Sequence, residues 1–308
     1  MGSTKHFLGD HNGARRHLEQ VLLHHIAPDH RRDVVRFQDV IRYGTNMRVS
    51  ARAYLAKILW LQGEADQAVR AAEASIEEAQ LTGHEYSVCY ALACAACPIA
   101  LWAGNLAAAA HYTGVLLDDA RKYGFPLWGA FGARFQIVVD LKGGYIDRGL
   151  RLLRTAIAES KPTFRFLTGL DELAEALGHA GRITEGLALV EAGIAHSEVG
   201  WLTPELLRLK GELLLLQSPR AVSERPEDLF RQSLDGARLQ DALSWELRAA
   251  TSLARLLRNQ GRPADAIACL QPVYDRFTEG FGTADLTAVK QLLNELSHGH
   301  QQRPTPDS

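Results

Sequence analysis

The chain has 308 residues, with 34 Lys and Arg against 36 Asp and Glu, 12 His and 4 Cys. An apolar fraction of 46% and a charged fraction of 23% are typical of a folded chain and exclude wholesale disorder. The formal net charge of -2 excludes a protein that holds nucleic acid mainly by bulk positive charge, and four Cys in so long a chain exclude a disulfide scaffold. We therefore expect a protein of the reducing cytoplasm with no direct nucleic acid partner.

The amino-terminal segment, residues 1–49, lacks the apolar run of a signal peptide. Residues 9–25 have the pattern of the second helix of a helix pair, and no first helix is predicted before them. We interpret residues 1–49 as a half-repeat followed by a connecting segment. Either another protein supplies the first helix, or the chain is the carboxyl-terminal portion of a longer polypeptide.

A helix–turn–helix pattern recurs over residues 50–282. Apolar helices end at glycines spaced by about 40 residues, and the last of these intervals is twice as long because one turn is replaced by a Pro-bearing loop near residues 217–218. The turn glycines are Gly63, Gly104, Gly144, Gly181 and Gly261. The predicted helix pairs are 50–62 with 65–82, 85–103 with 105–123, 126–142 with 146–160, 164–180 with 183–198, 203–217 with 226–241, and 243–260 with 263–277.

The first of these units shows why the pattern predicts paired helices. Tyr54 and Ile58 belong to an apolar stripe at helical spacing. Gly63 can adopt the positive φ that ends a helix, and Glu64 and Asp66 then suit the positive end of the next helix dipole. One such pair cannot bury its apolar face alone, so its neighbours must stack on it.

A run without formal charge extends from Tyr86 to Ala110 and is long enough to span a bilayer. The run is mostly Ala with Cys, Ser and Pro, and Gly104 with Asn105 interrupts it near its end. We therefore interpret it as a helix buried on all sides of a solenoid, and we expect no membrane partner.

The carboxyl-terminal end is predicted to be a capping helix over 283–297, with Thr283 as its N-cap, followed by a polar disordered tail over 298–308. No strand-like alternation is sustained anywhere in the sequence. The expected fold class is all-α, an α-solenoid of helix pairs.

Several strings resemble one family: RAYLAKILWLQG, CPIALWAGNLAAA, ELLRLKGELLLLQ, LSWELRAATSLARLLRNQGR and VYDRFTEGFGTADL. They resemble the carboxyl-terminal tetratricopeptide-like region of large bacterial signalling proteins of the rhizobial type. In those proteins a winged-helix domain or an adenylate/guanylate cyclase domain precedes a STAND-type ATPase, and the helical repeats follow. The resemblance covers residues 8–297 and implies a right-handed α-solenoid of about six tetratricopeptide-like pairs.

The chain also departs from that family. It contains no G-x-x-x-x-G-K-[ST] loop, no cyclase carboxylate pair and no winged helix. The output activities of the family therefore do not transfer to these residues. What the resemblance implies is a role in sensing a signal or binding a partner next to the ATPase.

Cysteines and histidines were considered as metal or redox sites. Cys94 and Cys97 form a C-x-x-C, with Cys89 one turn earlier, but a structural zinc site needs four ligands and a redox pair opens a helix after a strand. We interpret these cysteines as packed side chains, with redox or metal chemistry as the alternative. The clustered histidines, which we interpret as a solvated face, are His17, His24, His25 and His30.

Five tryptophans are distributed at about one per repeat, and an aromatic residue at a repeated helical position is usually part of the core. We therefore predict that Trp60, Trp102, Trp128, Trp201 and Trp245 are buried.

The best candidate binding residues lie on the first helices of the later pairs, which line the concave surface of such solenoids. Glu205, Arg208 and Glu212 share one helix face. One interpretation is a charged groove that binds a peptide, a phosphate-bearing ligand or an adjacent domain. The other is a ladder of salt bridges between repeats, in which Glu212 meets Arg248 or Arg255. The nine candidates are Asp171, Glu175, Glu205, Arg208, Glu212, Arg248, Thr251, Arg255 and Arg258.

Together these observations predict a non-enzymatic helical-repeat module for protein–protein interaction or signal sensing, part of or derived from a bacterial ATPase-type regulator of transcription or cyclase activity. The alternatives are a receptor domain for a small-molecule effector and a truncated gene product without independent function. We expect a protein or peptide partner, no catalytic residues, no cofactor and no metal, and we leave a homodimer open.

Overall fold

The computed structural model describes residues 1–24, 46–159, 170–195, 197–217 and 225–301. Within these ranges the chain is all-α and contains no strand. The helices of the amino-terminal half are α1 (Gly2–Phe7), α2 (His11–His24), α4 (Met47–Leu61), α5 (Ala65–Leu81), α6 (Glu85–Ala91), the π-helix η2 (Leu92–Ala96), α7 (Cys97–Trp102), α8 (Leu106–Tyr123), α9 (Pro126–Lys142) and α10 (Ile146–Glu159). Those of the carboxyl-terminal half are α11 (Leu170–His179), α12 (Ile183–Ala195), the 3-10 helix η4 (Ser197–Leu202), α13 (Thr203–Leu216), α14 (Pro226–Leu239), α15 (Leu243–Asn259), α16 (Pro263–Tyr274) and α17 (Ala284–Gln301).

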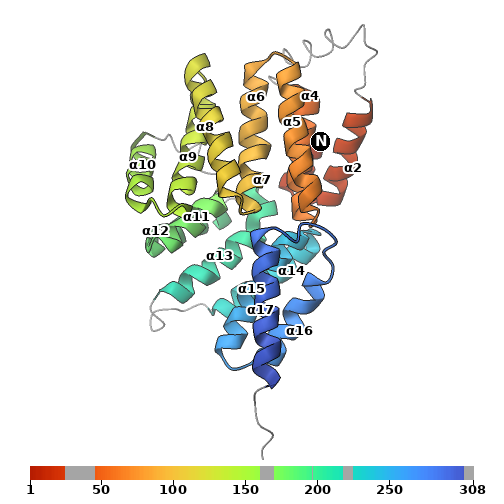
Figure 1. Ribbon diagram of the computed structural model, residues 1–308, viewed down its shortest axis with the longest axis vertical. Coiled ribbons are helices and arrows are strands. Elements are labelled where there is room, and N and C mark those ends of the chain that lie inside the picture. Colours follow the sequence, from red (N-terminus) through yellow and green to blue (C-terminus); the bar gives the residue numbers. More distant parts are fainter. Residues whose placement is uncertain (25–45, 160–169, 196, 218–224, 302–308) are drawn as a thin grey trace, which may run out of the picture.

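The predicted helix pairs are confirmed to within a few residues wherever the structure describes them. Each of the five predicted turn glycines has a positive φ, between 73° at Gly181 and 88° at Gly63. The interval without a turn glycine contains the loop between α13 and α14, and residues 218–224 of that loop lie outside the described residues. Packed helix pairs that follow one another along the chain make the fold a tetratricopeptide-like α-solenoid (Figure 1).

The two ends of the chain differ from the sequence predictions. A short helix, α1, precedes α2 and packs against α2 and α4, where the sequence predicts an unpaired half-repeat. The signal for α1 is weak because it has only six residues and no side-chain cap. At the other end, α17 extends to Gln301, into the segment predicted to be a disordered tail, and the first proline of that segment is Pro304.

The charge-free run forms α6, η2, α7 and the start of α8. The stretch from Glu85 to Trp102, which contains most of this run, is one helix long and apolar enough to cross a membrane, and 78% of it is buried inside the protein. It packs against α4, α5 and α8, so its apolar surface is already covered by protein, as expected for the core helix of a solenoid.

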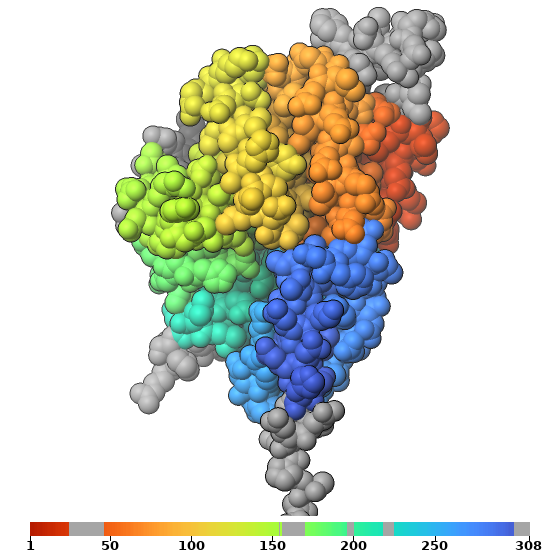
Figure 2. Space-filling view, viewed as in Figure 1, coloured from red at the N-terminus to blue at the C-terminus, as the bar shows by residue number. Residues whose placement is uncertain are grey.

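The solenoid curls until its last helices meet its first ones. In Figure 1 the helices α2 to α10 form the upper part of the molecule, and α15, α16 and α17 lie below α4, α5 and α7. The hydroxyl of Ser244 donates a hydrogen bond of 2.5 Å to the carbonyl oxygen of Trp60, 184 residues away. The amide of Ala284 donates one of 3.3 Å to the carbonyl oxygen of Ala103. Figure 2 shows the carboxyl-terminal helices in direct contact with the amino-terminal ones on this face.

Glycines permit this close approach. A Cβ at Gly104 would lie 2.5 Å from the Cβ of Ala284, and a Cβ at Gly280 would lie 2.7 Å from that of Ala65. Both glycines also have positive φ. Gly104, which follows the end of α7, and Gly280, which precedes α17, are therefore contact points between the first and last repeats.

The first and last repeats meet at a junction that is built around tryptophans. All five are buried, as predicted from their spacing. The ring centroid of Trp60 lies 4.9 Å from that of Trp102 and 5.1 Å from that of Trp245, and the Trp201 ring lies 6.2 Å from Trp102. Four aromatic side chains from widely separated parts of the chain thus form one apolar cluster at the centre of the closed solenoid.

Candidate functional site

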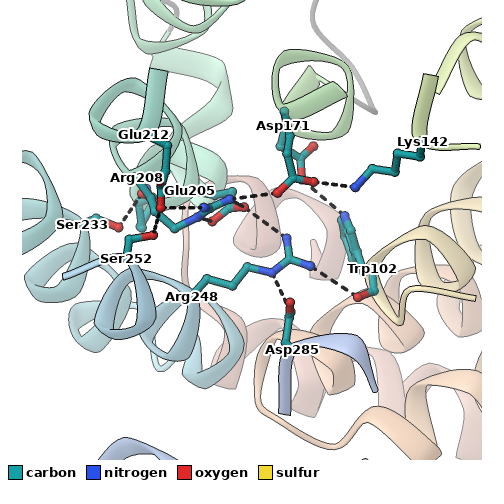
Figure 3. Close-up of polar contacts among 12 residues, drawn as sticks. Trp102, Lys142, Asp171, Glu205, Arg208, Glu212, Ser233, Arg248, Ser252 and Asp285 are labelled. Atoms are coloured by element: carbon teal, nitrogen blue, oxygen red, sulfur yellow. Dashed lines mark hydrogen bonds and ion pairs between the residues drawn. The ribbon is translucent and has the colours of Figure 1, made fainter. Parts of the chain in front are cut away.

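The structure places the nine predicted groove residues in three different settings. Six of them lie in or beside one charged layer next to Trp102 of the tryptophan cluster. Figure 3 labels all of these six except Glu175. Thr251 makes only a hydrogen bond within its own helix, and Arg255 and Arg258 are exposed near the carboxyl end of α15. The six that come together are Asp171, Glu175, Glu205, Arg208, Glu212 and Arg248.

Arg208 and Glu205, one turn apart on α13, form a buried bidentate ion pair. Arg208 Nε lies 2.8 Å from Oε2 of Glu205, and Nη2 lies 2.7 Å from Oε1. Burial lowers the pKa of Arg208, but the carboxylates of Glu205 and Glu175 raise it by more, so that it lies above its ordinary value. Arg208 therefore stays charged inside the protein.

Arg248 on α15 connects this pair to the rest of the junction. Its Nη1 lies 3.1 Å from Oε1 of Glu205, and its Nη2 donates a hydrogen bond of 3.3 Å to the carbonyl oxygen of Trp102. Its guanidinium carbon lies 5.0 Å from the ring centroid of Trp60 and 5.1 Å from that of Trp245. A guanidinium in this position gains cation–π attraction as well as charge pairing.

The acidic residues of α11 complete the layer on its other side. Lys142 Nζ lies 2.5 Å from Oε2 of Glu175. Burial raises the pKa of Glu175, but Lys142 and the two arginines lower it by more, so it falls below its ordinary value. Asp171 accepts a hydrogen bond of 3.3 Å from the indole Nε1 of Trp102. Burial, together with the charge of Glu172, raises its pKa well above its ordinary value.

The predicted ion pairs of Glu212 do not form. Glu212 accepts a hydrogen bond of 2.5 Å from Ser252 and lies 3.9 Å from Arg208, one turn earlier on its own helix. Arg248 instead turns toward Glu205 and Asp285 because its ring contacts hold it at the junction.

The remaining three candidates lie outside the charged layer. Thr251 is buried and donates to the carbonyl oxygen of Leu247 within its own helix. Arg255 and Arg258 are exposed, and Arg258 pairs with Glu295 of α17 at 2.7 Å.

The concave charges predicted to line a groove are thus largely paired with one another in the interior. The cause is the closure of the solenoid, which a periodic sequence does not reveal. Four participants in the layer were missing from the sequence prediction: Trp102, Lys142, Ser252 and Asp285.

Sequence reasoning also missed two buried charges beside the layer. Lys57 lies within the apolar string AYLAKILWL, and Glu172 follows Asp171 on α11. A charged residue on the apolar face of a helix is the signal that could have identified Lys57. Neither side chain forms a hydrogen bond or an ion pair with another side chain among the residues that the structure describes.

The cysteine and histidine candidates show no ligand set in the described ranges. No group of three His, Cys, Asp or Glu side chains there could hold a metal ion. Burial raises the pKa of each thiol, to about 12 at Cys89 and Cys97, so the sulfurs are protonated at neutral pH. His24 is exposed and His17 is half-buried, whereas His25 and His30 lie outside the described residues.

Comparison with protein families adds one firm observation. Residues 247–285 match the tetratricopeptide repeat family. The chain contains a tetratricopeptide-like repeat. The matched stretch begins within α15, includes α16 and ends in the first turn of α17, so it holds both Arg248 and Asp285. A search of curated proteins finds no match to the chain.

Proposed function

We propose that the chain is a non-enzymatic tetratricopeptide-like module that binds another protein in the cytoplasm. It would serve as the sensory part of a bacterial STAND-type ATPase regulator with a transcription or cyclase output. The tetratricopeptide match over residues 247–285 carries this proposal, since repeats of this class generally mediate protein–protein interactions. The resemblance of the repeat strings to such regulators supports the second part.

The closed solenoid is suited to signalling. Its first and last repeats meet through a few hydrogen bonds, among them those of Ser244 and Ala284, and through the side chain of Arg248. A partner that binds the closed form better than an opened form would shift the balance between the two. Binding of the signal would then change how the first and last repeats of the module are placed relative to each other.

The junction also provides an outer surface for a partner. Leu8, which follows α1, is 76% exposed, and Leu239, which ends α14, is 88% exposed. Their segments adjoin, because Asn12 donates a hydrogen bond of 2.7 Å to Asp241. Two exposed leucines on adjoining segments offer an apolar contact that changes if the segments separate.

The test is capture of the partner from the native host by the tagged full chain, with cross-linking and mass spectrometry. The expected result is enrichment of a polypeptide that carries a P-loop ATPase domain. The double variant Leu8→Ser/Leu239→Ser should lower that enrichment at least fivefold. The control Leu81→Ser, which alters a leucine that is 72% exposed on α5, should leave it unchanged.

Two results would contradict the proposal. One is recovery of the tagged chain as a monomer without any enriched partner. The other is enrichment of proteins that lack an ATPase domain, with equal yield from all variants. A homodimer would appear in the same experiment as enrichment of the untagged native chain.

A further inference from the structure

Lys57 is a buried lysine without a paired charge. It lies in the middle of α4 with 4% of its surface exposed, and it forms no hydrogen bond or ion pair with another described residue. Its ammonium lies 5.7 Å from the centroid of the Tyr54 ring, one turn earlier on the same helix. Burial lowers the pKa of Lys57, as expected for an ammonium removed from water.

Glu172 is its counterpart on α11. The residue is 5% exposed, and neither carboxylate oxygen has a hydrogen-bond partner among the described residues. The carboxyl groups of Glu172 and Asp171 raise the pKa of Lys57 and so partly offset the effect of burial. Both residues belong to the surroundings of the tryptophan cluster. The Tyr54 ring beside Lys57 contacts His6, which contacts Trp201, and Asp171, the neighbour of Glu172 in the sequence, accepts from Trp102.

The groups around Lys57 are polar and aromatic. Tyr90 approaches from α6, where its hydroxyl lies 3.1 Å from Oγ of Ser50. The ring centroid of His6, in α1, lies 4.7 Å from that of Trp201, and its Nε2 is buried without a hydrogen-bond partner among the described residues. Its ring centroid lies 5.8 Å from that of Tyr54. His6 therefore contacts the same Tyr54 ring beside which the ammonium lies.

The arrangement differs from the charged layer nearby. There, Lys142 and Glu175 lie within hydrogen-bonding distance, and Glu205 has two arginine partners. A buried charge without a partner is strongly unfavourable, and most proteins avoid it. Two such charges of opposite sign that form no ion pair with each other can both be satisfied by a molecule that carries an anion at one end and a cation at the other.

We propose that Lys57 and Glu172 bind a small zwitterion of the amino acid class inside the solenoid. The carboxylate of the ligand accepts from Nζ of Lys57, and its ammonium donates to the carboxylate of Glu172. The Tyr54 ring and His6 lie beside the ligand and select its side chain. This proposal deepens the proposed function, because it gives the chemical class of the signal that the module senses.

The first test is a ligand screen of the purified full chain by thermal unfolding and titration calorimetry. The probes are the proteinogenic amino acids, each compared with the carboxylic acid that lacks its amine and with the amine that lacks its carboxylate. At least one amino acid should raise the unfolding midpoint in a concentration-dependent way, and both of its truncated analogues should bind at least tenfold more weakly.

Variants test the assignment of the two residues. Lys57→Met and Glu172→Gln should each weaken binding of that amino acid at least tenfold. Lys142→Met is the matched control, because it removes a lysine of the neighbouring charged layer that is already paired with Glu175. It should leave the affinity unchanged.

The stability of the variants without ligand is an independent readout. Because the two charges are unpartnered, Lys57→Met and Glu172→Gln should unfold at the same midpoint as the native chain or at a higher one. Lys142→Met should unfold at a lower midpoint, since it leaves Glu175 with one partner fewer. A purely structural ion pair, bridged by water, would instead make all three variants less stable.

Two outcomes would overturn the inference: no amino acid in the panel binds, or binding survives both substitutions. Neither affects the capture of a protein partner. Failure of the ligand site and failure of the proposed function are therefore distinguishable.

Discussion

Nε of Arg248 donates a hydrogen bond of 2.7 Å to a carboxylate oxygen of Asp285, which joins α15 to the first turn of α17. The same guanidinium also contacts Trp60 and Trp102, from the first two full repeats. One side chain of the matched tetratricopeptide repeat therefore connects the last helix to the beginning of the array. Closure of the solenoid depends on contacts of this kind.

Replacing Arg248 with Met should lower the free energy of unfolding by about 3 kcal/mol. The reason is that Glu205, which is almost completely buried, would lose one of its two arginine partners. Urea unfolding monitored by tryptophan fluorescence measures the change. Arg258→Met is the control, because its pair with Glu295 is exposed and should contribute no more than about 1 kcal/mol. Equal effects of the two substitutions would show that Arg248 does not hold the junction.

Gly104→Ala should destabilise the chain more than Gly261→Ala. Both glycines end helices, with φ of 77° and 76°, so both variants carry the cost of a left-handed alanine, about 1 kcal/mol. Only at Gly104 would the new Cβ also meet Ala284, at 2.5 Å, whereas nothing lies within 4 Å at Gly261. The added overpacking should cost a further 1–3 kcal/mol, roughly, in urea unfolding. An equal decrease in the free energy of unfolding for both variants would show that α17 does not pack against Gly104.

The helices were predictable from the sequence because the signals that begin and end each helix are local. Gly63 and Gly261 take the positive φ that their position after an apolar helix requires, and Asp66 lies in the first turn of α5 as expected. Burial of the tryptophans followed from their spacing. All of these signals act over one helix or one turn.

Closure was not predictable, because it joins residues far apart in a repetitive chain. Nothing near Ser244 specifies that its hydroxyl will bond to Trp60, and nothing near Arg248 specifies Asp285 as its partner. The candidate residues were therefore recognised as charges on first helices, but their setting was missed. The pairing of Glu212 with Arg248 was wrong for the same reason.

The amino-terminal helices should loosen in acid. His6 and His11 are buried with their Nδ1 atoms 3.4 Å apart, and burial lowers the pKa of both imidazoles, to about 4 at His11. A lowered pKa means that the folded state prefers neutral imidazole, so this stability is complete above the unfolded pKa of 6.5 and is lost as the pH falls toward 4. For His11 the loss is about 3 kcal/mol.

Hydrogen exchange of residues 1–24 between pH 7.5 and pH 4.5, corrected for the intrinsic rate, measures this loosening. Protection should decrease across that interval in the native chain and should change less in His11→Asn. The control His111→Asn alters an exposed histidine on α8 and should behave like the native chain. A native profile that is flat with pH would contradict the assignment of neutral imidazoles.

The four thiols should be unreactive in the folded chain. Burial raises the pKa of every cysteine, to about 11 at Cys269 and to about 12 at Cys97. At pH 8 the thiolate fraction at Cys269 is then on the order of a thousandth. Iodoacetamide labelling followed by mass spectrometry should be at least a hundredfold slower than in urea. Rapid labelling of Cys94 would instead favour the redox interpretation of the C-x-x-C.

The amide of Ala284 reports most directly on the closed solenoid. The first amides of a helix have no partner within that helix, and this one donates to the carbonyl oxygen of Ala103, on the far side of the junction. Hydrogen exchange of this single amide, measured by NMR at neutral pH, should be slowed at least a hundredfold relative to the intrinsic rate. Exchange at the intrinsic rate, in a chain whose α15 and α16 amides remain protected, would show that the solenoid is open.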